Sequence, residues 1–333
     1  MKLDSPLVSL IIANYNGKKW LKDFFNSVKT QDYPNIEVIF FDNGSADGSC
    51  NFVKKIYPKA VIIENNVNIG FGPANNEAVK HNSGEILFFV NNDTKFSKDL
   101  VSKLVRAKHN SKAHIIAPIT VDAQGNDHYE GKYLGMDILG YPGPSDRLFY
   151  VEGCSLMISR SDFDYLGGFD PKYFLYSEEI DLCWRAHIFD MKIVLDKSIS
   201  IFHYGGGSTF STRKERGVKH KVPLLRRYEV EKNTLRNILK NYNAINVLWI
   251  LPLFFTQLLA ELVLYLISSE FGAARTLLKA VFWNVRNIKD TLKKRKIVQN
   301  KRVRSDIYVF KKMIWSSMKI KAFSNTGFPA FKK

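Results

Sequence analysis

The sequence predicts an α/β protein with a mostly parallel sheet flanked by helices, followed by a basic, amphipathic helical C-terminal region. Two observations lead to this prediction. Short apolar runs alternate with segments of helical spacing in the first two thirds, and the excess positive charge lies in the last third. With 333 residues, 45% of them hydrophobic, the chain is long enough for one large domain with an appendage or for two domains.

The expected strands are four short runs rich in Val, Ile and Phe, at residues 8–13, 37–41, 60–64 and 85–90. The expected helices between them cover residues 20–28, 48–56 and 73–81. This alternation is typical of βαβ units, whose sheet is covered on both faces. Each run ends in Asn, Asp or Gly, and open sheets of this kind bind ligands beyond the carboxyl ends of their strands. The strand ends are therefore the expected place for chemistry.

Several other classes of protein are disfavoured. Three scattered cysteines are too few for a disulfide framework or a CxxC metal site, and indicate reduced thiols. The N-terminal apolar run, residues 8–12, is too short for a signal peptide, which predicts a catalytic part facing the cytoplasm. A dinucleotide-binding G-x-G-x-x-G motif is absent, because the nearest stretch carries Asn75 at the third glycine and follows the third strand. A P-loop is absent because Ile12 stands where its first glycine is needed.

Six motifs resemble those of the family 2 glycosyltransferases of GT-A fold, in particular the rhamnosyltransferase-like branch. In chain order they read VSLIIANYNG, FFDNGSADGS, NNVNIGFGPANN, FFVNNDT, GGFDPKYFLYSEEIDLCWR and FHYGGGS. The resemblance covers about residues 6–240. It implies a GT-A nucleotide-diphospho-sugar transferase that moves a single sugar, with rhamnose suggested by the branch, from a UDP- or dTDP-linked donor to a hydroxyl of a glycan or lipid-linked acceptor. Processive members carry Q-x-x-R-W after the acidic motif, and its absence here predicts a non-processive enzyme.

The same resemblance implies a divalent metal site. A cation held by carboxylate stabilises the departing pyrophosphate, and Mg²⁺ or Mn²⁺ is often held by only one or two carboxylates plus phosphate oxygens. Asp93 occupies the last position of the D-x-D-type motif, after Asn91 and Asn92. The metal then lacks one charge, and the resemblance suggests His203 as a second ligand. The alternatives are a simple Asn-Asp turn and a structural histidine.

The resemblance also implies a donor pocket. Asp42 lies where the family reads the nucleobase, and a carboxylate there can accept the imide N–H of uracil or thymine. Its alternative role is that of a turn or N-cap residue. Tyr15 is expected to pack against the base, with core packing as the alternative. The whole set expected to bind the nucleotide sugar is Ala13, Tyr15, Asp42, Asn68, Gly70 and Asn92.

The acidic motif SEEIDLCWR is expected to supply the base. An inverting transfer needs a carboxylate that takes the proton of the acceptor hydroxyl. The family uses the second residue of a Glu-Asp pair, which maps to Glu179, with Asp181 as the reserve candidate. The motif is predicted to begin a helix near Glu178, where acids also suit the helix dipole. The loop 205–212 is expected to cover the donor and exclude water.

The C-terminal third carries the chain's basicity. Residues 213–333 contain 27 Lys/Arg and 7 Asp/Glu, whereas residues 1–212 have a net charge of −3. This shift predicts a catalytic domain over 1–212 and a membrane-associating region over 213–333. Residues 271–285 place Phe271, Ala274, Leu278, Val281 and Val285 on one helix face, with Arg275, Lys279 and Arg286 elsewhere. Together with the basic cluster 293–296, this pattern is typical of attachment to an anionic membrane and is less suited to nucleic acid.

Residues 244–267 form an apolar segment of 24 residues with one charge, long enough to span a bilayer. Pro252, Gln257 and Glu261 argue against a membrane span. The segments on both sides of it are basic, and the positive-inside rule would place both on the same side of the membrane, which a single span does not allow. Peripheral attachment at the cytoplasmic face of the cell membrane is therefore predicted, with a span as the alternative. Two other functions stay open: a non-catalytic membrane-surface binder on the same fold, and a nucleotidyltransferase, which is disfavoured because no Gly-rich, Arg-containing loop follows the first strand.

Overall fold

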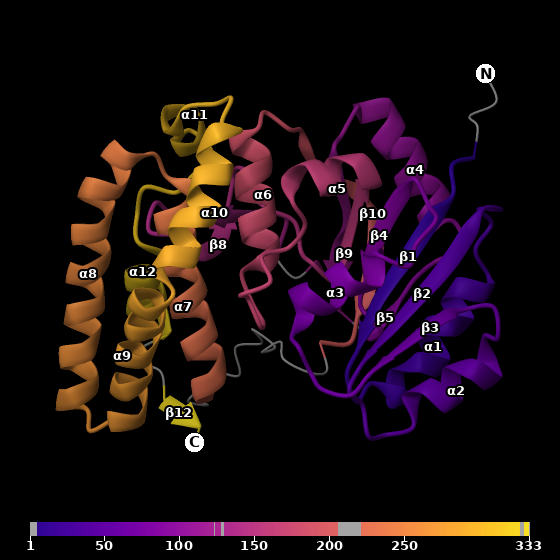
Figure 1. Ribbon diagram of the computed structural model, residues 1–333, viewed down its shortest axis with the longest axis horizontal. Helices are drawn as coiled ribbons and strands as arrows, with labels where there is room; N and C mark the ends of the chain where they lie inside the picture. Colours follow the sequence, from indigo (N-terminus) through magenta and orange to yellow (C-terminus); the bar gives the residue numbers. More distant parts are fainter. Residues whose placement is uncertain (1–4, 123, 128–129, 206–220, 327–329, 333) are drawn as a thin grey trace. The chain divides into compact units, whose positions relative to one another are not determined.

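The computed structural model describes residues 5–122, 124–127, 130–205, 221–326 and 330–332, in a chain that divides into two compact units (Figure 1). Unit 1 comprises residues 1–131, 151–174 and 191–211, and unit 2 comprises residues 132–150, 175–190 and 212–333. The last change of unit lies beside the predicted domain boundary at residue 212. Segments 132–150 and 175–190 belong to unit 2, although the charge distribution grouped them with the N-terminal part.

Unit 1 is built on one eight-stranded sheet in the order β3-β2-β1-β4-β9-β6-β10-β5. Its strands are β1 (Val8–Asn14), β2 (Ile36–Asn43), β3 (Val61–Asn65), β4 (Ile86–Val90), β5 (Thr94–Lys95), β6 (Ile115–Val121), β9 (Ser155–Ser159) and β10 (Ile193–His203). β1 to β4 run parallel, as do β6 and β10, while β9 and β5 run antiparallel to their neighbours. The prediction of a mostly parallel sheet is confirmed.

Helices cover both faces of this sheet. On one face α1 (Lys18–Lys29), α2 (Ser49–Ile56) and α4 (Leu100–Ser111) pack on alternate residues of β1, Leu10 and Ile12 among them. On the other face lie α3 (Phe71–Val79) and α5 (Arg160–Leu166), where the rings of Phe89 and Phe163 are 5.0 Å apart. The four strands and three helices predicted from residues 8–90 all occur, with ends within two residues of the predicted ones. The polar loops that follow β1, β2 and β4 lie at one edge of the sheet.

Unit 2 is mainly helical. Its helices are α6 (Glu178–Ile188), α7 (Leu224–Asn241), α8 (Ala244–Ile267), α9 (Phe271–Arg286), α10 (Ile288–Asn300), α11 (Asp306–Phe310) and α12 (Met318–Thr326). Two short sheets pair β7 (Tyr133–Met136) with β8 (Pro142–Ser145) and β11 (Lys221–Pro223) with β12 (Ala330–Lys332). Helix α6 begins at Glu178, and α8 covers residues 244–267, as predicted. Helix α7 packs against α6, α8, α9 and α10.

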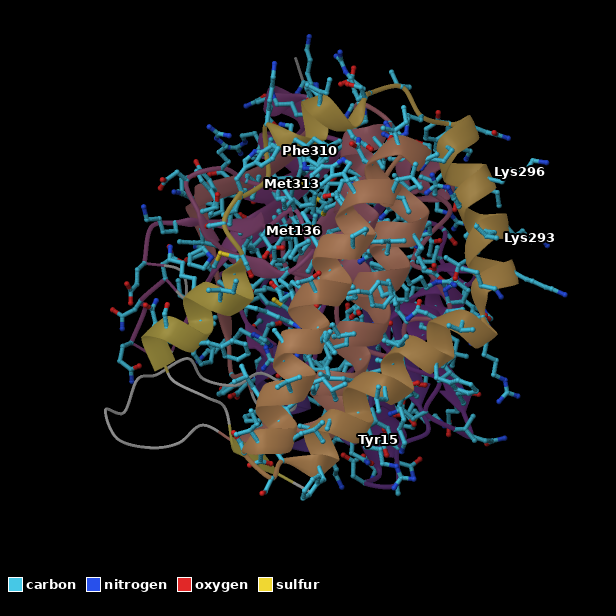
Figure 2. All side chains as sticks on the ribbon, turned by 90° about the vertical axis from the view of Figure 1, so that its left-hand side faces the viewer. Tyr15, Met136, Lys293, Lys296, Phe310 and Met313 are labelled. Atoms are coloured by element: carbon cyan, nitrogen blue, oxygen red, sulfur yellow. The ribbon has the colours of Figure 1, made fainter. Side chains whose placement is uncertain are left out.

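Helices α8 and α9 each pack one face into unit 2 and expose the other (Figure 2). The exposed large apolar side chains are Ile245, Leu248, Leu253, Phe255, Leu259, Val263, Leu264, Leu266 and Ile267 on α8, and Phe271, Leu278, Phe282 and Val285 on α9. The predicted apolar face of α9 is wrong at Ala274, which is buried. Small side chains at 273, 274 and 280 lie on the buried face, where they permit close approach to a neighbouring helix.

Candidate active site

A chain of amides and a carboxylate joins the ends of β4, β1 and β2. Asn92 Nδ2 donates to Asn14 Oδ1 at 2.5 Å, and Asn14 Nδ2 donates to Asp42 Oδ1 at 2.8 Å. The other carboxylate oxygen of Asp42 accepts the backbone N–H of Ser45 at 2.9 Å. Fully buried Asn14 was not among the predicted site residues. Its signal was available, because it is the polar residue that closes the first apolar strand.

Asp42 is buried and fixed by its neighbours. Besides Asn14 and Ser45, the thiol of Cys50 donates to its carboxylate, and burial, followed by the charges of Asp42 and Glu64, raises the pKa of Cys50 to about 12. The Cys50 thiol therefore stays protonated at neutral pH. A carboxylate has about four acceptor positions, so three donors leave room for one more. The turn role and the nucleobase role can coexist at Asp42.

The loop after β1 holds Tyr15 outward. Asn16 adopts φ +50°, its N–H donates to Ser45 Oγ at 2.8 Å, and its side-chain oxygen accepts the N–H of Ala46 at 2.9 Å. Between these anchors the Tyr15 side chain is 52% exposed, whereas Ala13 is half-buried on β1. The alternative that Tyr15 packs in the core is therefore wrong. An aromatic ring held at an exposed strand end can stack on a planar base.

The loop after β3 is organised around Asn68 and Gly70. Asn68 Oδ1 accepts from Asn43 Nδ2 and from the N–H of Gly70, both at 2.9 Å. Gly70 adopts φ +96°, and a Cβ there would lie 2.4 Å from the carbonyl oxygen of Phe174. That oxygen accepts the N–H of Phe71 at 2.8 Å, so the backbone is already in close contact. Glycine is needed here for its conformation and for its lack of a side chain.

Asp93 and His203, 110 residues apart in sequence, lie together. His203 Nε2 is 3.0 Å from Asp93 Oδ1, and both side chains are mostly buried. The antiparallel pairing of β5 with β10 sets Thr94 opposite His203, which fixes this approach. Burial opposes the charged imidazole, but the hydrogen bond and charge of Asp93, with a contribution from Glu152, outweigh it and raise the pKa of His203.

The pair fits a divalent cation of the Mn²⁺ or Mg²⁺ type. Adjacent ligands of an octahedral cation with bonds of about 2.1 Å stand about 3 Å apart, close to the spacing of this carboxylate and imidazole. Within the described ranges no cluster of three or more His, Cys, Asp or Glu residues could hold a metal. A cation there would take its other ligands from phosphate and water. The pair thus suits a metal that arrives with its substrate.

Glu152 is a further acid near this pair that the sequence reasoning missed. It accepts a hydrogen bond from Thr120 Oγ1. Burial, followed by the charge of Glu152 and then, more weakly, that of Asp93, raises the pKa of the Cys154 thiol well above its usual range. Glu152 therefore adds negative charge close to Asp93 and His203. Its only signal was an isolated Glu after an apolar segment, which is weak evidence by itself.

The acidic motif lies in unit 2, where its carboxylates differ. Glu178 is buried, and its burial, followed by repulsion from Glu179 and Glu229, raises its pKa well above the usual range. Glu179 is half-buried. Both oxygens of Asp181 are engaged: Oδ1 by Lys240 at 2.8 Å and Oδ2 by Arg185 at 2.8 Å. These contacts commit Asp181 to holding α6 against α7, and so favour Glu179 over Asp181 as a base. Residues 206–212 of the expected cover loop lie outside the described residues.

Known proteins resemble this chain over the region that carries these motifs. Residues 9–181 match glycosyl transferase family 2. The chain is 24% identical over 240 residues to the N-acetylglucosaminyl-diphospho-decaprenol L-rhamnosyltransferase of Mycobacterium tuberculosis, covering 62% of this chain and 78% of that enzyme. It is 23% identical over 194 residues to the low-salt glycan biosynthesis hexosyltransferase Agl10 of Haloferax volcanii, covering 54% and 61%.

Two solved structures share the fold. One is S. aureus TarS 1-349 in complex with UDP-GlcNAc, with TM-score 0.57 and 16% identity over 88% of this chain and 90% of that one. The other is the mannosyltransferase PcManGT of Pyrobaculum calidifontis in complex with GDP-Man and Mn²⁺, with TM-score 0.52 and 15% identity over 89% and 86%. At these identities the likeness is one of fold.

Proposed function

The chain belongs to glycosyl transferase family 2, close to the rhamnosyltransferases and with the GT-A fold, and from this premise we propose an inverting, non-processive, metal-dependent transfer of one sugar. The donor is a nucleotide-diphosphate sugar, and the acceptor is a sugar hydroxyl in polysaccharide biosynthesis. The observation that carries the proposal is the buried Asp93–His203 pair at the end of β4, in the unit that also carries the Asn92–Asn14–Asp42 chain.

The donor is a UDP- or dTDP-linked sugar. Asp42 keeps one acceptor position for the imide N–H of a pyrimidine, and the exposed ring of Tyr15 stacks on that base. Asn68 and Gly70 shape a loop whose backbone approaches the ligand closely. The likeness to a rhamnosyltransferase makes rhamnose the first sugar to try.

The transfer step needs a base and a stabilised leaving group. Asp93 and His203 would hold a divalent cation that neutralises the charge of the departing nucleoside diphosphate. Glu179 takes the proton of the acceptor hydroxyl, whose oxygen forms a bond to the anomeric carbon as the bond to the diphosphate oxygen breaks. Burial, followed by repulsion from Glu179, raises the pKa of Glu178 well above its usual range, so the two neighbouring carboxyl groups lie in different environments.

The acceptor is a glycan or lipid-linked sugar at an anionic membrane surface. The Mycobacterium tuberculosis relative carries a lipid-linked acceptor in its name, which supports this class. Exposed apolar side chains on α9 alternate with Arg275, Lys279 and Arg286. Lys293 and Lys296 project outward from α10 (Figure 2). Such a surface suits anionic lipid, and residues 213–333 would provide it to a catalytic part formed by residues 1–212.

Helix α8 lies on the membrane surface in this proposal and does not cross the bilayer. It is the one helix of the described part of the chain that is long and apolar enough to cross. Its single charge, Glu261, is buried inside unit 2, where it pairs with Arg227 and with Lys319 at 2.9 Å, and accepts from Tyr265 at 2.6 Å. A transmembrane position would strip Glu261 of partners contributed by other segments, at a high cost. The opposite, apolar face remains free for lipid.

A thermal-shift panel tests the donor and metal proposals together. Full-length protein in mild detergent is heated with UDP, dTDP, GDP or CDP, each with and without Mn²⁺. At 100 times its dissociation constant a ligand adds about 2.7 kcal/mol, which is several degrees. A shift that needs both Mn²⁺ and a pyrimidine diphosphate, and is lost in Asp93→Asn, supports the proposal. No shift with any nucleotide favours the non-catalytic membrane binder.

A further inference from the structure

The turn that precedes the acidic motif is held in an unfavourable backbone conformation. Tyr176 and Ser177 adopt φ +67° and +66°, two successive left-handed residues that are not glycine. Ser177 is the N-cap of α6, yet its side chain makes no capping hydrogen bond to the helix. Such conformations persist only where the surroundings enforce them. Glu178 and Glu179 follow at once, so this turn sets where both carboxyl groups point.

Helix α7 supplies the groups that hold the turn. Fully buried Asn233 uses its Nδ2 to donate to the carbonyl oxygens of Leu175, at 3.0 Å, and Tyr176, at 2.7 Å. The carboxylate of Glu229, one helical turn earlier, accepts the backbone N–H of Leu175. Glu229 is itself paired with Lys232 Nζ at 2.5 Å. The peptide groups before the two left-handed residues are thus bound from one helix.

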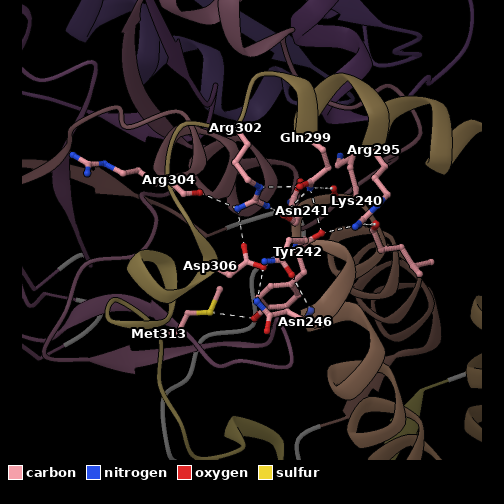
Figure 3. Close-up of polar contacts among 12 residues, drawn as sticks. Lys240, Asn241, Tyr242, Asn246, Arg295, Gln299, Arg302, Arg304, Asp306 and Met313 are labelled. Atoms are coloured by element: carbon pink, nitrogen blue, oxygen red, sulfur yellow. Dashed lines mark hydrogen bonds and ion pairs between the residues drawn. The ribbon is translucent and has the colours of Figure 1, made fainter.

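Helix α7 is itself fixed along its length. Near its middle, the Lys232 ammonium lies 4.9 Å from the centre of the Trp283 ring of α9. At its C-terminal end, Arg295 and Gln299 of α10 donate to the last carbonyl oxygens, 239–242 (Figure 3). These bonds satisfy the carbonyl groups that every helix end leaves open. Asn233 therefore acts from a rigid support.

We propose that Asn233, assisted by Glu229, is a positioning residue that holds the turn 175–177 in its left-handed conformation and thereby places Glu179 for proton removal from the acceptor. The inference rests on the base role of Glu179 in the proposed function. It gives part of the basic C-terminal third a task in the transfer itself, besides membrane attachment. Loss of the two Nδ2–H bonds frees the turn to relax, which moves the carboxylate that follows it.

The test compares Asn233→Leu with Asn284→Leu in the full-length protein. Asn284 is an equally buried amide of the same unit, and its Nδ2 also donates to two carbonyl oxygens, those of Lys232 and Ala280. A misplacement of about 1 Å costs on the order of 100-fold in rate, so Asn233→Leu should lower kcat by about that factor with the donor KM little changed. Asn284→Leu should lower Tm comparably but keep kcat within about threefold of the unmodified enzyme.

A glycine at position 177 separates positioning from general stability. Glycine adopts φ +66° without steric cost, so Ser177→Gly in the Asn233→Leu background should recover kcat at least about fivefold. If Asn233→Leu does not fold, Asn233→Ala removes the same donors without added bulk, with the same expected losses. Provided that Glu179→Gln is inactive, two results overturn the inference. One is an unchanged kcat in the Asn233 variant; the other is an equal loss of kcat in the Asn233 and Asn284 variants that Ser177→Gly does not restore. If Glu179→Gln retains transfer, the proposed function fails instead.

Discussion

Replacing Gly70 by alanine should disrupt the loop after β3 far more than the same replacement at Gly167, a glycine of the same unit with open space around it. Gly70 adopts φ +96° and ψ 169°, a region that is almost restricted to glycine. Its added Cβ would lie 2.4 Å from Phe174 O and 2.7 Å from Phe174 Cα. Both atoms belong to backbone, so a side-chain rotation cannot relieve the contact. The loop or the Phe174 segment must move.

The cost can be worked out from these contacts. The backbone conformation costs about 1–3 kcal/mol for a residue with a Cβ, and overpacking costs about 1–3 kcal/mol more. Movement of Phe174 also weakens the hydrogen bond from Phe71 N–H, 2.8 Å long, which is worth about 1 kcal/mol. The sum is about 3–7 kcal/mol. At Gly167, with φ +85° and no atom within 4 Å of the added Cβ, only the left-handed conformation costs, about 1–2 kcal/mol.

Thermal unfolding and nucleotide binding measure this difference. For a unit of about 150–250 residues, 1 kcal/mol shifts Tm by about 2–4 °C, so Gly70→Ala should lose about 6–28 °C and Gly167→Ala about 2–8 °C. Below its Tm, Gly70→Ala should also lose the Mn²⁺-dependent shift with nucleotide, because the loop carrying Asn68 is displaced. Equal Tm losses in the two variants, or full nucleotide binding by Gly70→Ala, would refute the reasoning.

Three further predictions concern metal, protons and lipid. The affinity for Mn²⁺, followed by electron paramagnetic resonance, should fall as pH falls through the raised pKa of His203, because the proton held beside Asp93 competes with the metal; a pH-independent affinity contradicts this. Buried Asp137 has its pKa raised to about 6 by burial, so its contribution to stability is present below pH 4 and lost as pH rises to 6. The unmodified protein should therefore lose about 2–3 kcal/mol of unfolding free energy relative to Asp137→Asn as the pH rises from 4 to 6. A difference between the two proteins that does not change with pH would contradict the assignment. Binding to anionic vesicles should weaken when Lys293 and Lys296 become Glu, while neutral vesicles, the control, show no such change; unchanged sedimentation with anionic vesicles rejects this surface.

The sequence predicted the parts of unit 1 that depend on local pattern. The strands and helices over residues 8–90 follow from short apolar runs with polar ends, because β1, β2 and β4 are mostly buried on both faces and the loops are not. The edge strand β3 has the same pattern although it is partly exposed. The antiparallel strand β9 was not foreseen, since an apolar run such as Ser155–Ser159 has the same composition in either direction. Direction is decided by the connection, which the pattern does not contain.

The candidate site, like the fold, was predicted only in part from the sequence. Asp93 and His203 were expected together from motif order, and the pairing of β5 with β10 brings them to 3.0 Å. Asn14 and Glu152 were missed because their importance lies in what they contact across the sheet. Asn14 bonds to residues 28 and 78 positions away. A single polar residue at a strand end looks the same whether it only caps that strand or joins three.

The basic C-terminal third shows where a count of charge misleads. A net charge of +20 over residues 213–333 predicts a solvated surface for lipid, yet Lys232, Arg236, Lys240 and Lys319 are all buried in ion pairs. Lys232 pairs with Glu229 within α7, whereas the other three cations pair with Asp290, Asp181 and Glu261 on other helices and so join helices of unit 2. Exposed residues such as Lys293 remain available for the proposed membrane surface. Removal of one member of a buried pair leaves an uncompensated charge and is far more costly than loss of an exposed lysine. Lys240→Met should therefore lower the stability of unit 2 by about 3–5 kcal/mol without weakening vesicle binding per folded molecule, and the reverse pattern would place Lys240 at the lipid surface.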